Sequence, residues 1–377
     1  MPKAAYLHIP FCNQICHYCD FNKVFIHRQP VDEYLDCMEK EIIYTLKKHP
    51  RSTMETIFVG GGTPTALNDK QLNRLLTSIH THLMPNSSEV EYTFEANPDD
   101  MTREKLVLLK DAGVNRLSFG VQSFNDELLK KIGRSHSAKQ AHRAIEMAQD
   151  VGFHNINVDL IYSLPDQTIP DFMHTLLEAF SLGIQHFSAY SLIIEPKTVF
   201  YTLMNKNRLP LPSQEDEATM YEILMEQMER HGYHQYEISN FAKAGLESKH
   251  NLTYWNNEEY YGFGAGSHGY VNGHRNANYG PLKKYMAKLA DGELPYIESH
   301  KVTKEEAIQE EMFLGLRRMS GVNKMEFRQK YGMDIQEIFS AQIKLLLAQK
   351  LIEETDSVIR LTHQGKFLGN EVFQRFI

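Results

Sequence analysis

Three of the four cysteines, Cys12, Cys16 and Cys19, lie close together near the amino terminus. Four cysteines in a chain of 377 residues do not make a disulfide framework, so metal binding is the better interpretation of this group. Three thiolates can hold three irons of a [4Fe–4S] cluster and leave the fourth iron open to an external ligand. A structural zinc site would need a fourth ligand, for which His17 and Asp20 are candidates, so that alternative stays open.

A second motif, Gly60–Thr65, has the sequence GGGTPT and directly follows an expected strand. Glycines at such a turn let the backbone come close to a ligand and present its N–H and C=O groups. The cysteines also follow an expected strand, the first of the chain. We therefore expect both motifs at the same end of a barrel, where the glycine turn contacts a small polar molecule.

The elements that position these motifs alternate between short strand-like runs and amphipathic helical patterns up to about residue 195. This alternation is typical of βαβ units around a parallel sheet. We expect strands at Ala4–Ile9, Glu55–Val59, Val90–Glu95, Arg116–Gln122, Asn155–Tyr162 and Gln185–Ser191. Helices are expected at Asp32–Lys48, Lys70–Leu83, Ser137–Val151 and Asp171–Leu182.

Polar side chains alternate with apolar ones along several of these strands, and alternate positions point to opposite faces. In a barrel wrapped by helices the apolar face lies outward, so Glu95, Arg116, Gln122 and Asp159 face the interior. A well-filled barrel carries Val, Ile and Leu there, so these residues predict a cavity for a polar ligand. The alternative is an antiparallel sheet with one solvated face.

The rest of the chain is expected to add a smaller unit. Ser213 caps a helix that runs to about His231, and Thr303-x-x-Glu306 is a capping box that begins another. Further expected elements are a strand near Tyr233–Ile238, a glycine-rich loop at Tyr261–Tyr270, a connection at Asp291–His300, helices near Lys324–Tyr331 and Ile335–Gln349, strands at Leu351–Glu353 and Val358–Leu361, and a last helix. This pattern predicts two domains, 1–290 and 301–377, the second mostly helical and winged-helix-like.

Bulk composition excludes some classes of partner. The net charge of -8, with acidic and basic residues mixed along the chain, gives no sign of a nucleic-acid surface or a polybasic membrane anchor. No stretch reaches the ~18 consecutive apolar residues of a membrane span, and the amino terminus does not have the pattern of a signal peptide. We therefore expect a cytoplasmic protein. The fourth cysteine, Cys37, lies alone in a helical pattern.

Several motifs in one order resemble a known family. They are Tyr6-x-His8-Ile9-Pro10-Phe11-Cys12, the cysteine spacing with Tyr18, Gly60–Thr65, Glu95-Ala96-Asn97-Pro98 and Gly120-Val121-Gln122-Ser123-Phe124. Over roughly residues 4 to 270 they resemble the oxygen-independent coproporphyrinogen III oxidase group of the radical SAM superfamily. The resemblance implies an α/β fold with a partial (β/α) barrel of the TIM type, followed by the small C-terminal domain.

The same resemblance implies roles for individual residues. Cys12, Cys16 and Cys19 would hold the cluster, whose open iron takes the amino and carboxylate groups of S-adenosylmethionine. The positions that would line the S-adenosylmethionine region are Tyr6, Tyr18, Gly61, Gly62, Thr63, Glu95, Gln122, Arg134 and Asp159. For Arg134 the alternative is a surface cation.

Two features set the chain apart from the oxidases of that group. Those proteins carry a further cysteine two positions after the third, where this chain has Phe21. The chain also contains His250-Asn251-x-x-Tyr254-Trp255, which resembles the HNxxYW motif of HemW-type haem chaperones. The resemblance implies that His250 is an axial haem ligand, with the two aromatic residues on the porphyrin face.

For His250 the alternative is a hydrogen-bonded histidine in a buried aromatic cluster. His268 and His274 lie close in sequence and are possible substitutes as haem ligands.

Three functions follow from these patterns. The first is a haem chaperone that binds the cluster, S-adenosylmethionine and haem and delivers haem to respiratory haem proteins. The second is an enzyme that decarboxylates two propionates of coproporphyrinogen III, and the third is a structural or redox protein that only carries a cluster. A homodimer, peripheral membrane contact through partners, and the question of whether the chain is an enzyme are left open.

Overall fold

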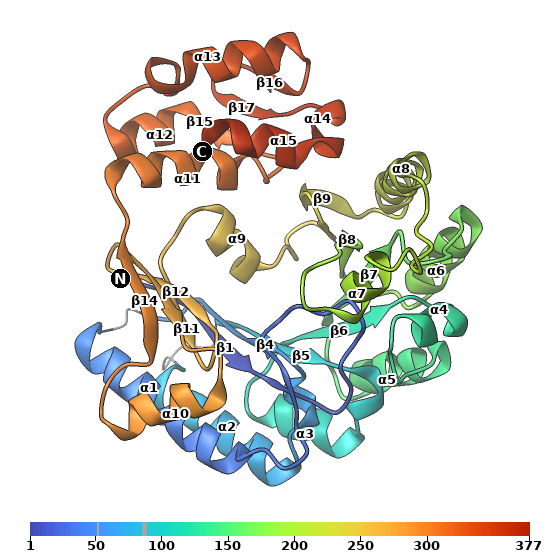
Figure 1. Cartoon of the computed structure of the whole chain (residues 1–377), viewed down its shortest axis with the longest axis vertical. Coiled ribbons are helices and arrows are strands. Elements are labelled where there is room, and N and C mark those ends of the chain that lie inside the picture. Colours follow the sequence, from blue (N-terminus) through green and yellow to red (C-terminus); the bar gives the residue numbers. More distant parts are fainter. Residues whose placement is uncertain (51–52, 85–88) are drawn as a thin grey trace.

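The computed structural model describes residues 1–50, 53–84 and 89–377. Its main feature is a 12-stranded sheet whose centre is parallel. The parallel strands pair in the order β1 (Ala4–Ile9), β4 (Thr56–Gly61), β5 (Glu91–Ala96), β6 (Arg116–Gln122), β7 (Asn155–Tyr162) and β8 (His186–Ser191). These are the six expected strands, within two residues at each end, and Figure 1 shows them following an open curve. The predicted partial barrel is confirmed, and the antiparallel alternative is wrong for these strands.

Helices cover the outer face of this curve (Figure 1). They are α1 (Val31–Lys48), α2 (Asp69–His82), α3 (Arg103–Asp111), α4 (Asp126–Lys131), α5 (Ala138–Asp150) and α6 (Ile169–Ser181). Capping boxes begin α2, α5 and α6, in which the N-cap side chain and the residue three positions later satisfy each other's backbone N–H groups. The sequence patterns did not predict α3 and α4.

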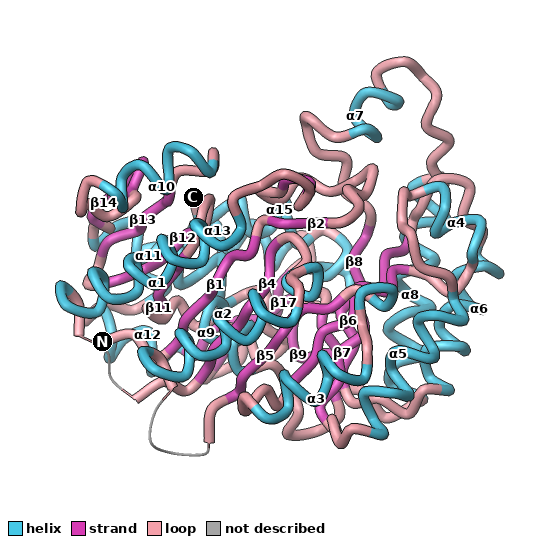
Figure 2. The backbone as a smooth tube through the Cα atoms, turned by 90° about the horizontal axis from the view of Figure 1, so that it is seen from below, coloured by secondary structure: helices cyan, strands magenta, loops and turns pink. Residues whose placement is uncertain are grey.

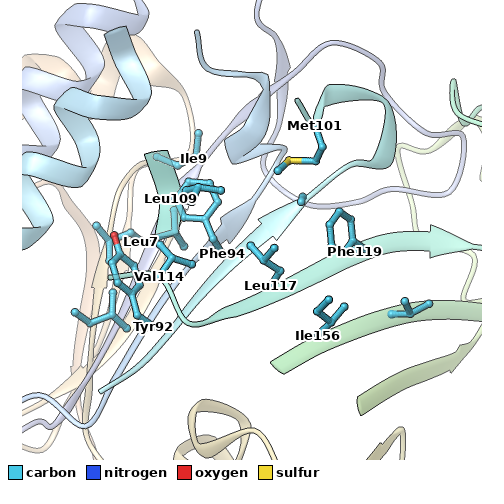
Figure 3. Close-up of a cluster of buried hydrophobic side chains, with 14 of the residues drawn as sticks. Leu7, Ile9, Tyr92, Phe94, Met101, Leu109, Val114, Leu117, Phe119 and Ile156 are labelled. Carbon is cyan, nitrogen blue, oxygen red and sulfur yellow. The ribbon is translucent and has the colours of Figure 1, made fainter. Parts of the chain in front are cut away.

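Apolar side chains fill the space between the sheet and these helices. Phe94, Leu117, Phe119 and Ile156 are fully buried there, and Figure 3 shows them on the same side of their strands. This is the outward face predicted from the alternation of side chains, so the polar positions between them face the inside of the curve.

Further strands extend the sheet at both edges. Beyond β8 lie β10 (Asn240–Ala242) and β9 (His234–Glu237), after helix α8 (Gln214–Arg230). Beyond β1 lie β11 (Tyr260–Phe263), β12 (His268–Val271), β13 (His274–Asn278) and β14 (Tyr296–Lys301).

Two expectations at the β1 edge are wrong. The glycine-rich stretch Tyr261–Tyr270, expected as a loop, contributes to β11 and β12, and the connection Asp291–His300 contains most of β14. In the first stretch, Gly262 allows β11 and β12 to lie close together. A Cβ added to Gly262 would lie only 1.8 Å from the carbonyl oxygen of His268, so a side chain there would push the two strands apart.

The C-terminal part has its own small sheet, with β15 (Val322–Asn323), β17 (Val358–Leu361) and β16 (Ile352–Glu354) in that order. Around it lie α11 (Lys304–Gly315), α12 (Lys324–Tyr331), α13 (Ile335–Ala348), α14 (His363–Phe367) and α15 (Gly369–Phe373), after α10 (Leu282–Ala290). The predicted capping box at Thr303 and Glu306 begins α11. The buried apolar residues here form a cluster separate from that of the large sheet. The division into 1–290 and 301–377 stays a prediction.

Smaller elements complete the inner side and the rim of the barrel. Helix α9 (Lys249–Trp255) lies inside the curve of the sheet, toward the C-terminal helices (Figure 1). Strands β2 (Phe11–Cys12) and β3 (Val24–Phe25) pair with each other just after β1, and α7 (Val199–Met204) stands apart from the covering helices in Figure 2. In the described part of the chain, no helix combines the length and the apolar character that crossing a membrane requires.

Candidate functional site

The three clustered cysteines lie at the mouth of a cavity. Cys12 ends β2, just beyond the carboxyl end of β1, and Cys16 and Cys19 follow in the next loop. All three line a cavity of about 400 Å³, a size usual for small-molecule sites. Its other lining residues include Tyr18, Gly61, Gly62, Thr63, Glu95, Asn97, Arg116, Gly120, Gln122, Arg134, Asn157 and Asp159. The structure thus brings together the predicted cluster ligands and all but one of the residues predicted for S-adenosylmethionine.

A chain of hydrogen bonds links two of the thiols. Thr63 Oγ1 donates to Cys12 Sγ at 3.6 Å, and Asn97 Nδ2 donates to Thr63 Oγ1 at 3.2 Å. Arg134 Nη2 donates to Asn97 Oδ1 at 2.9 Å, while its Nη1 donates to Cys16 Sγ at 3.3 Å. Asn97 was part of a recognised motif but was not predicted as a site residue. Its amide connects Thr63 with Arg134 and so fixes both donors to the sulfur atoms.

Arg134 reaches this position because Gly120 leaves room for it. Arg134 Nη2 donates to the Gly120 carbonyl oxygen, and a Cβ on Gly120 would lie 2.9 Å from that nitrogen. The guanidinium lines the cavity, so the surface-cation alternative does not describe it. The charge of Arg134 also acts to lower the pKa of Cys12, in favour of the thiolate form that binds iron.

The protonation of Cys12 and Cys19 is set mainly by burial. Burial raises the pKa of Cys12 to about 11, partly offset by the hydrogen bond from Thr63. Burial also raises the pKa of Cys19, against the nearby charge of Lys23. Metal binding requires thiolates, so a cluster at this site has to displace protons that the protein alone holds firmly.

The donor set fits a cluster better than a single ion. Among the described residues, no three His, Cys, Asp or Glu side chains are grouped as ligands of one metal ion. A cubane takes one thiolate on each of three irons, so its cysteines lie further apart than the ligands of one zinc. Of the two candidate zinc ligands, His17 has its Nδ1 3.0 Å from the Lys131 carbonyl oxygen, and Asp20 lines the cavity. Cys37, on α1, is part of the apolar core and does not line this cavity.

Two carboxyl groups face the cavity, Glu95 from β5 and Asp159 from β7, with β6 between these two strands. Glu95 Oε2 accepts a hydrogen bond of 2.9 Å from the Gly61 backbone N–H. Gly60 makes this contact possible, because a Cβ there would lie 2.6 Å from the carboxyl carbon of Glu95. Burial, followed by the charge of Asp159, raises the pKa of Glu95 to about 7. Glu95 is therefore poised between its neutral and ionised forms near neutral pH.

Asp159 lies within a polar network on the inner face. Asn157 Nδ2 donates to Asp159 Oδ1 at 2.8 Å, and Ser118 Oγ donates to Oδ2 at 3.4 Å. Burial raises the pKa of Asp159, and these donors act in the opposite direction. Gln122 reaches the cavity at a β-bulge, where its φ of 69° is in the left-handed region that non-glycine residues seldom adopt.

Arg116 forms the inner end of the cavity. Only 2% of its surface is exposed, and its Nε has no hydrogen-bond partner among the described residues. The sequence pattern predicts that Arg116 faces inward, but nothing in the sequence indicates that its buried Nε lacks a partner.

The two predicted tyrosines differ in their positions. Tyr18 lines the cavity between the cysteines, and burial raises its pKa well above the usual value. Tyr6 does not line it, and its hydroxyl lies 2.9 Å from His8 Nδ1. Tyr6 is the one predicted S-adenosylmethionine contact that the cavity does not include.

His250 lies outside this cavity, at the amino ends of β4 and β5. Its Nδ1 is 2.8 Å from Thr56 Oγ1, its Nε2 is 2.8 Å from the Tyr254 hydroxyl, and its ring stacks on Phe58. Only 1% of its surface is exposed, and burial, followed by the charge of Arg116, lowers its pKa to about 3. Both nitrogens are engaged in this conformation, which corresponds to the hydrogen-bonded alternative.

Helix α9 is fixed in place at both ends. The Glu91 carboxylate on β5 accepts hydrogen bonds of 3.0 Å from the backbone N–H groups of Lys249 and His250. At the other end, the Arg317 guanidinium lies 4.6 Å from the centre of the Trp255 ring. The motif thus connects the barrel with the C-terminal part. The other candidate histidines lie on the edge strands, His268 exposed on β12 and His274 on β13.

Comparison with protein families agrees with this architecture. The open parallel barrel, with three cysteines after its first strand and a polar inner face, is that of a radical SAM protein. The family model described as the radical SAM superfamily matches residues 6–179, and that of the HemN C-terminal domain matches residues 302–368.

Curated relatives narrow the assignment. The chain is 56% identical to the heme chaperone HemW of Bacillus subtilis, with 100% of this chain and 99% of the relative covered. It is 44% identical to the HemW of Lactococcus lactis (100% and 97% covered) and 32% identical to that of Escherichia coli (100% and 98% covered). The chain belongs to the HemW family.

A solved structure shows the same fold. Coproporphyrinogen III oxidase (HemN) from Escherichia coli, described as a radical SAM enzyme, superposes with a TM-score of 0.87 at 24% identity. The match covers 100% of this chain and 90% of that one. At this identity the likeness establishes the fold alone.

Proposed function

We propose that this chain is a cytoplasmic haem chaperone that carries a [4Fe–4S] cluster and S-adenosylmethionine, binds haem and delivers it to respiratory haem proteins. The observation that carries the proposal is the full-length similarity to curated proteins named heme chaperone HemW, at 56% identity for one of them. The site supports it, because the cysteines and the polar residues expected to hold these cofactors lie around one cavity.

In this proposal Cys12, Cys16 and Cys19 hold the cluster. The bound cluster supplies an iron with an open coordination position. Thr63 and Arg134 donate hydrogen bonds to two of the sulfur atoms, which stabilises thiolate charge at the edge of the cavity. A hydrogen bond to a charged group contributes about 1.5–3 kcal/mol, so these contacts help to retain the cluster.

The cavity below the cysteines would hold S-adenosylmethionine. Glu95 and Asp159 can accept hydrogen bonds from the hydroxyl and amino groups of this ligand, and Gln122 can donate or accept. The same cavity is also lined by Gly61, Gly62 and Thr63, whose backbone groups can contact the ligand. Tyr18 would contact the ligand from the cysteine loop, and Tyr6 would act from behind the wall, through His8.

Ligation of haem by His250 stays a prediction, and it requires that a hydrogen bond of the His250 ring is broken first. An iron atom can reach its ring only if the contact with Thr56 or with Tyr254 opens. Since Glu91 and Trp255 fix the two ends of α9, such opening would disturb its junction with the C-terminal part.

Coproporphyrinogen III oxidation is the second candidate, because the motifs around the cysteines also resemble those of the oxidases. Phe21 stands where those enzymes carry a further cysteine, which argues against it. Two assays on one preparation with cluster, S-adenosylmethionine and reductant decide between them. A chaperone binds haem and forms no protoporphyrinogen from coproporphyrinogen III, whereas turnover of that substrate would overturn the proposal.

A further inference from the structure

Large apolar side chains are exposed around the mouth of the cavity. Phe21, in the cysteine loop, is 61% exposed, and Ile193, just after β8, is 64% exposed. Tyr190, at the end of β8, is 42% exposed. All three line the cavity that contains the thiols, so they belong to one continuous site. Exposed apolar groups gathered in this way mark binding surfaces more often than isolated ones do.

The two sides of this mouth come from different parts of the chain and are held together by contacts. The Phe200 backbone N–H, on α7, donates to the His17 carbonyl oxygen at 3.1 Å, and their rings lie 5.9 Å apart. On the cysteine side, Asn22 Nδ2 donates to the carbonyl oxygens of Ala265 and Gly280, which fixes the residue next to Phe21. These contacts fix the cysteine loop and the segment after β8, and the apolar side chains of both are exposed to solvent.

The segment that follows β8 at the mouth carries more cations than carboxylates. The segment from 192 to 213, between β8 and α8, contains Lys197, Lys206 and Arg208, all exposed, and one acidic residue, Glu195. Of the charged residues near the mouth, Lys23, Asp20 and Glu195 line the cavity itself. An occupant with a broad apolar body and acidic groups at its edge would match this combination.

We propose that haem docks on this surface, formed by Phe21, Tyr190 and Ile193, with its ring on the apolar groups beside the cluster and its propionates toward the cations of the 192–213 segment. The inference rests on the proposed function, because it locates the haem that the chaperone would carry. It differs from ligation at His250, which lies at the opposite ends of the strands. At the mouth, haem would meet apolar groups without any hydrogen bond of α9 opening.

The test compares two isoleucines of nearly equal exposure. Ile193→Glu places a charge under the proposed ring, and Ile297→Glu makes the same change on edge strand β14, where Ile297 is 60% exposed. Haem is titrated into each cluster-loaded protein and followed by its Soret absorbance. We expect Ile193→Glu to weaken binding by at least about tenfold and Ile297→Glu to bind like the wild type. Iron and sulfide contents equal to the wild type show that the cluster is intact.

Two further measurements keep the alternatives apart. Wild-type affinity in Ile193→Glu, or loss confined to His250→Gln, would overturn the mouth surface while leaving the chaperone proposal in place. A wild-type protein that binds no haem would overturn the proposed function together with this surface. Gel filtration tests the other occupant, a second copy of the chain: a change from dimer to monomer in Ile193→Glu with unchanged haem affinity would refute haem docking.

Discussion

Glu95→Ala tests the proposed S-adenosylmethionine cavity at the residue with the clearest geometry. The carboxyl group is held by the Gly61 N–H at 2.9 Å and faces the cavity without touching the cysteines. A hydrogen bond from the ligand to this charged group is worth roughly 1.5–3 kcal/mol, so its loss corresponds to about 10- to 150-fold weaker binding. Because the raised pKa of about 7 makes the carboxylate predominate only above neutral pH, the wild type should bind more tightly at pH 8 than at pH 6.

The assay is calorimetric titration of S-adenosylmethionine into cluster-loaded protein at both pH values. Glu127→Ala on α4, an exposed carboxylate, serves as the matched control and should bind like the wild type. Glu95→Ala should bind S-adenosylmethionine more weakly than the wild type at pH 8. Its affinity should differ little between pH 6 and pH 8, and its iron and sulfide contents should equal those of the wild type. Unchanged affinity in the variant would refute the inward placement of Glu95 as a ligand contact.

Three other predictions address the cluster, its support and the barrel. Changing any cluster cysteine to Ala should abolish stable reconstitution measured by iron and sulfide counts, whereas Cys37→Ala should not; equal loss in Cys37→Ala would contradict the three-cysteine assignment. Arg134→Met should release iron to a chelator faster than the wild type and than Arg143→Met, an exposed control on α5, because it removes the donor to Cys16; equal release rates would show that this donor does not support the cluster. Burial raises the pKa of Glu41 to about 7, above its value in the unfolded chain, so its contribution to stability is complete below about pH 4.5 and is lost as the pH rises through 7. In urea unfolding of the cluster-free protein, the free energy of unfolding of the wild type relative to Glu41→Gln should fall by on the order of 3 kcal/mol between pH 4.5 and 8, and a constant difference would contradict the raised pKa.

The barrel could be predicted from the sequence because its signals are local. Strands such as Asn155–Tyr162 alternate apolar and polar residues, and the apolar half has to be buried under helices. The same alternation placed Glu95 and Asp159 inside without knowledge of any contact. The sequence is misleading where glycine has two interpretations. The pattern around Gly262 predicts a loop or tight turns, whereas in the structure the absence of a side chain at Gly262 allows two strands to lie close together.

The parts of the site that could not be predicted depend on contacts between distant segments. Asn97 joins Thr63 to Arg134 only because three different connections meet at the carboxyl ends of the strands. The partners of His250 likewise include Thr56, far away in sequence, which no local pattern reveals. The motif His250-Asn251-x-x-Tyr254-Trp255 predicts either a haem ligand or a buried, hydrogen-bonded histidine. Only the packing of α9 shows which atoms the two ring nitrogens of His250 contact.

The central claim, that this chain carries haem and gives it to other proteins, is tested most directly by a transfer experiment. Cluster-loaded protein saturated with haem is mixed with the haem-free form of a respiratory haem protein, and the Soret spectra of the two are followed after their separation. We expect haem to leave this chain and to appear on the acceptor faster than it does from free haem at equal concentration. Haem that stays with the chain, or an acceptor that fills no faster than from free haem, would contradict the chaperone function.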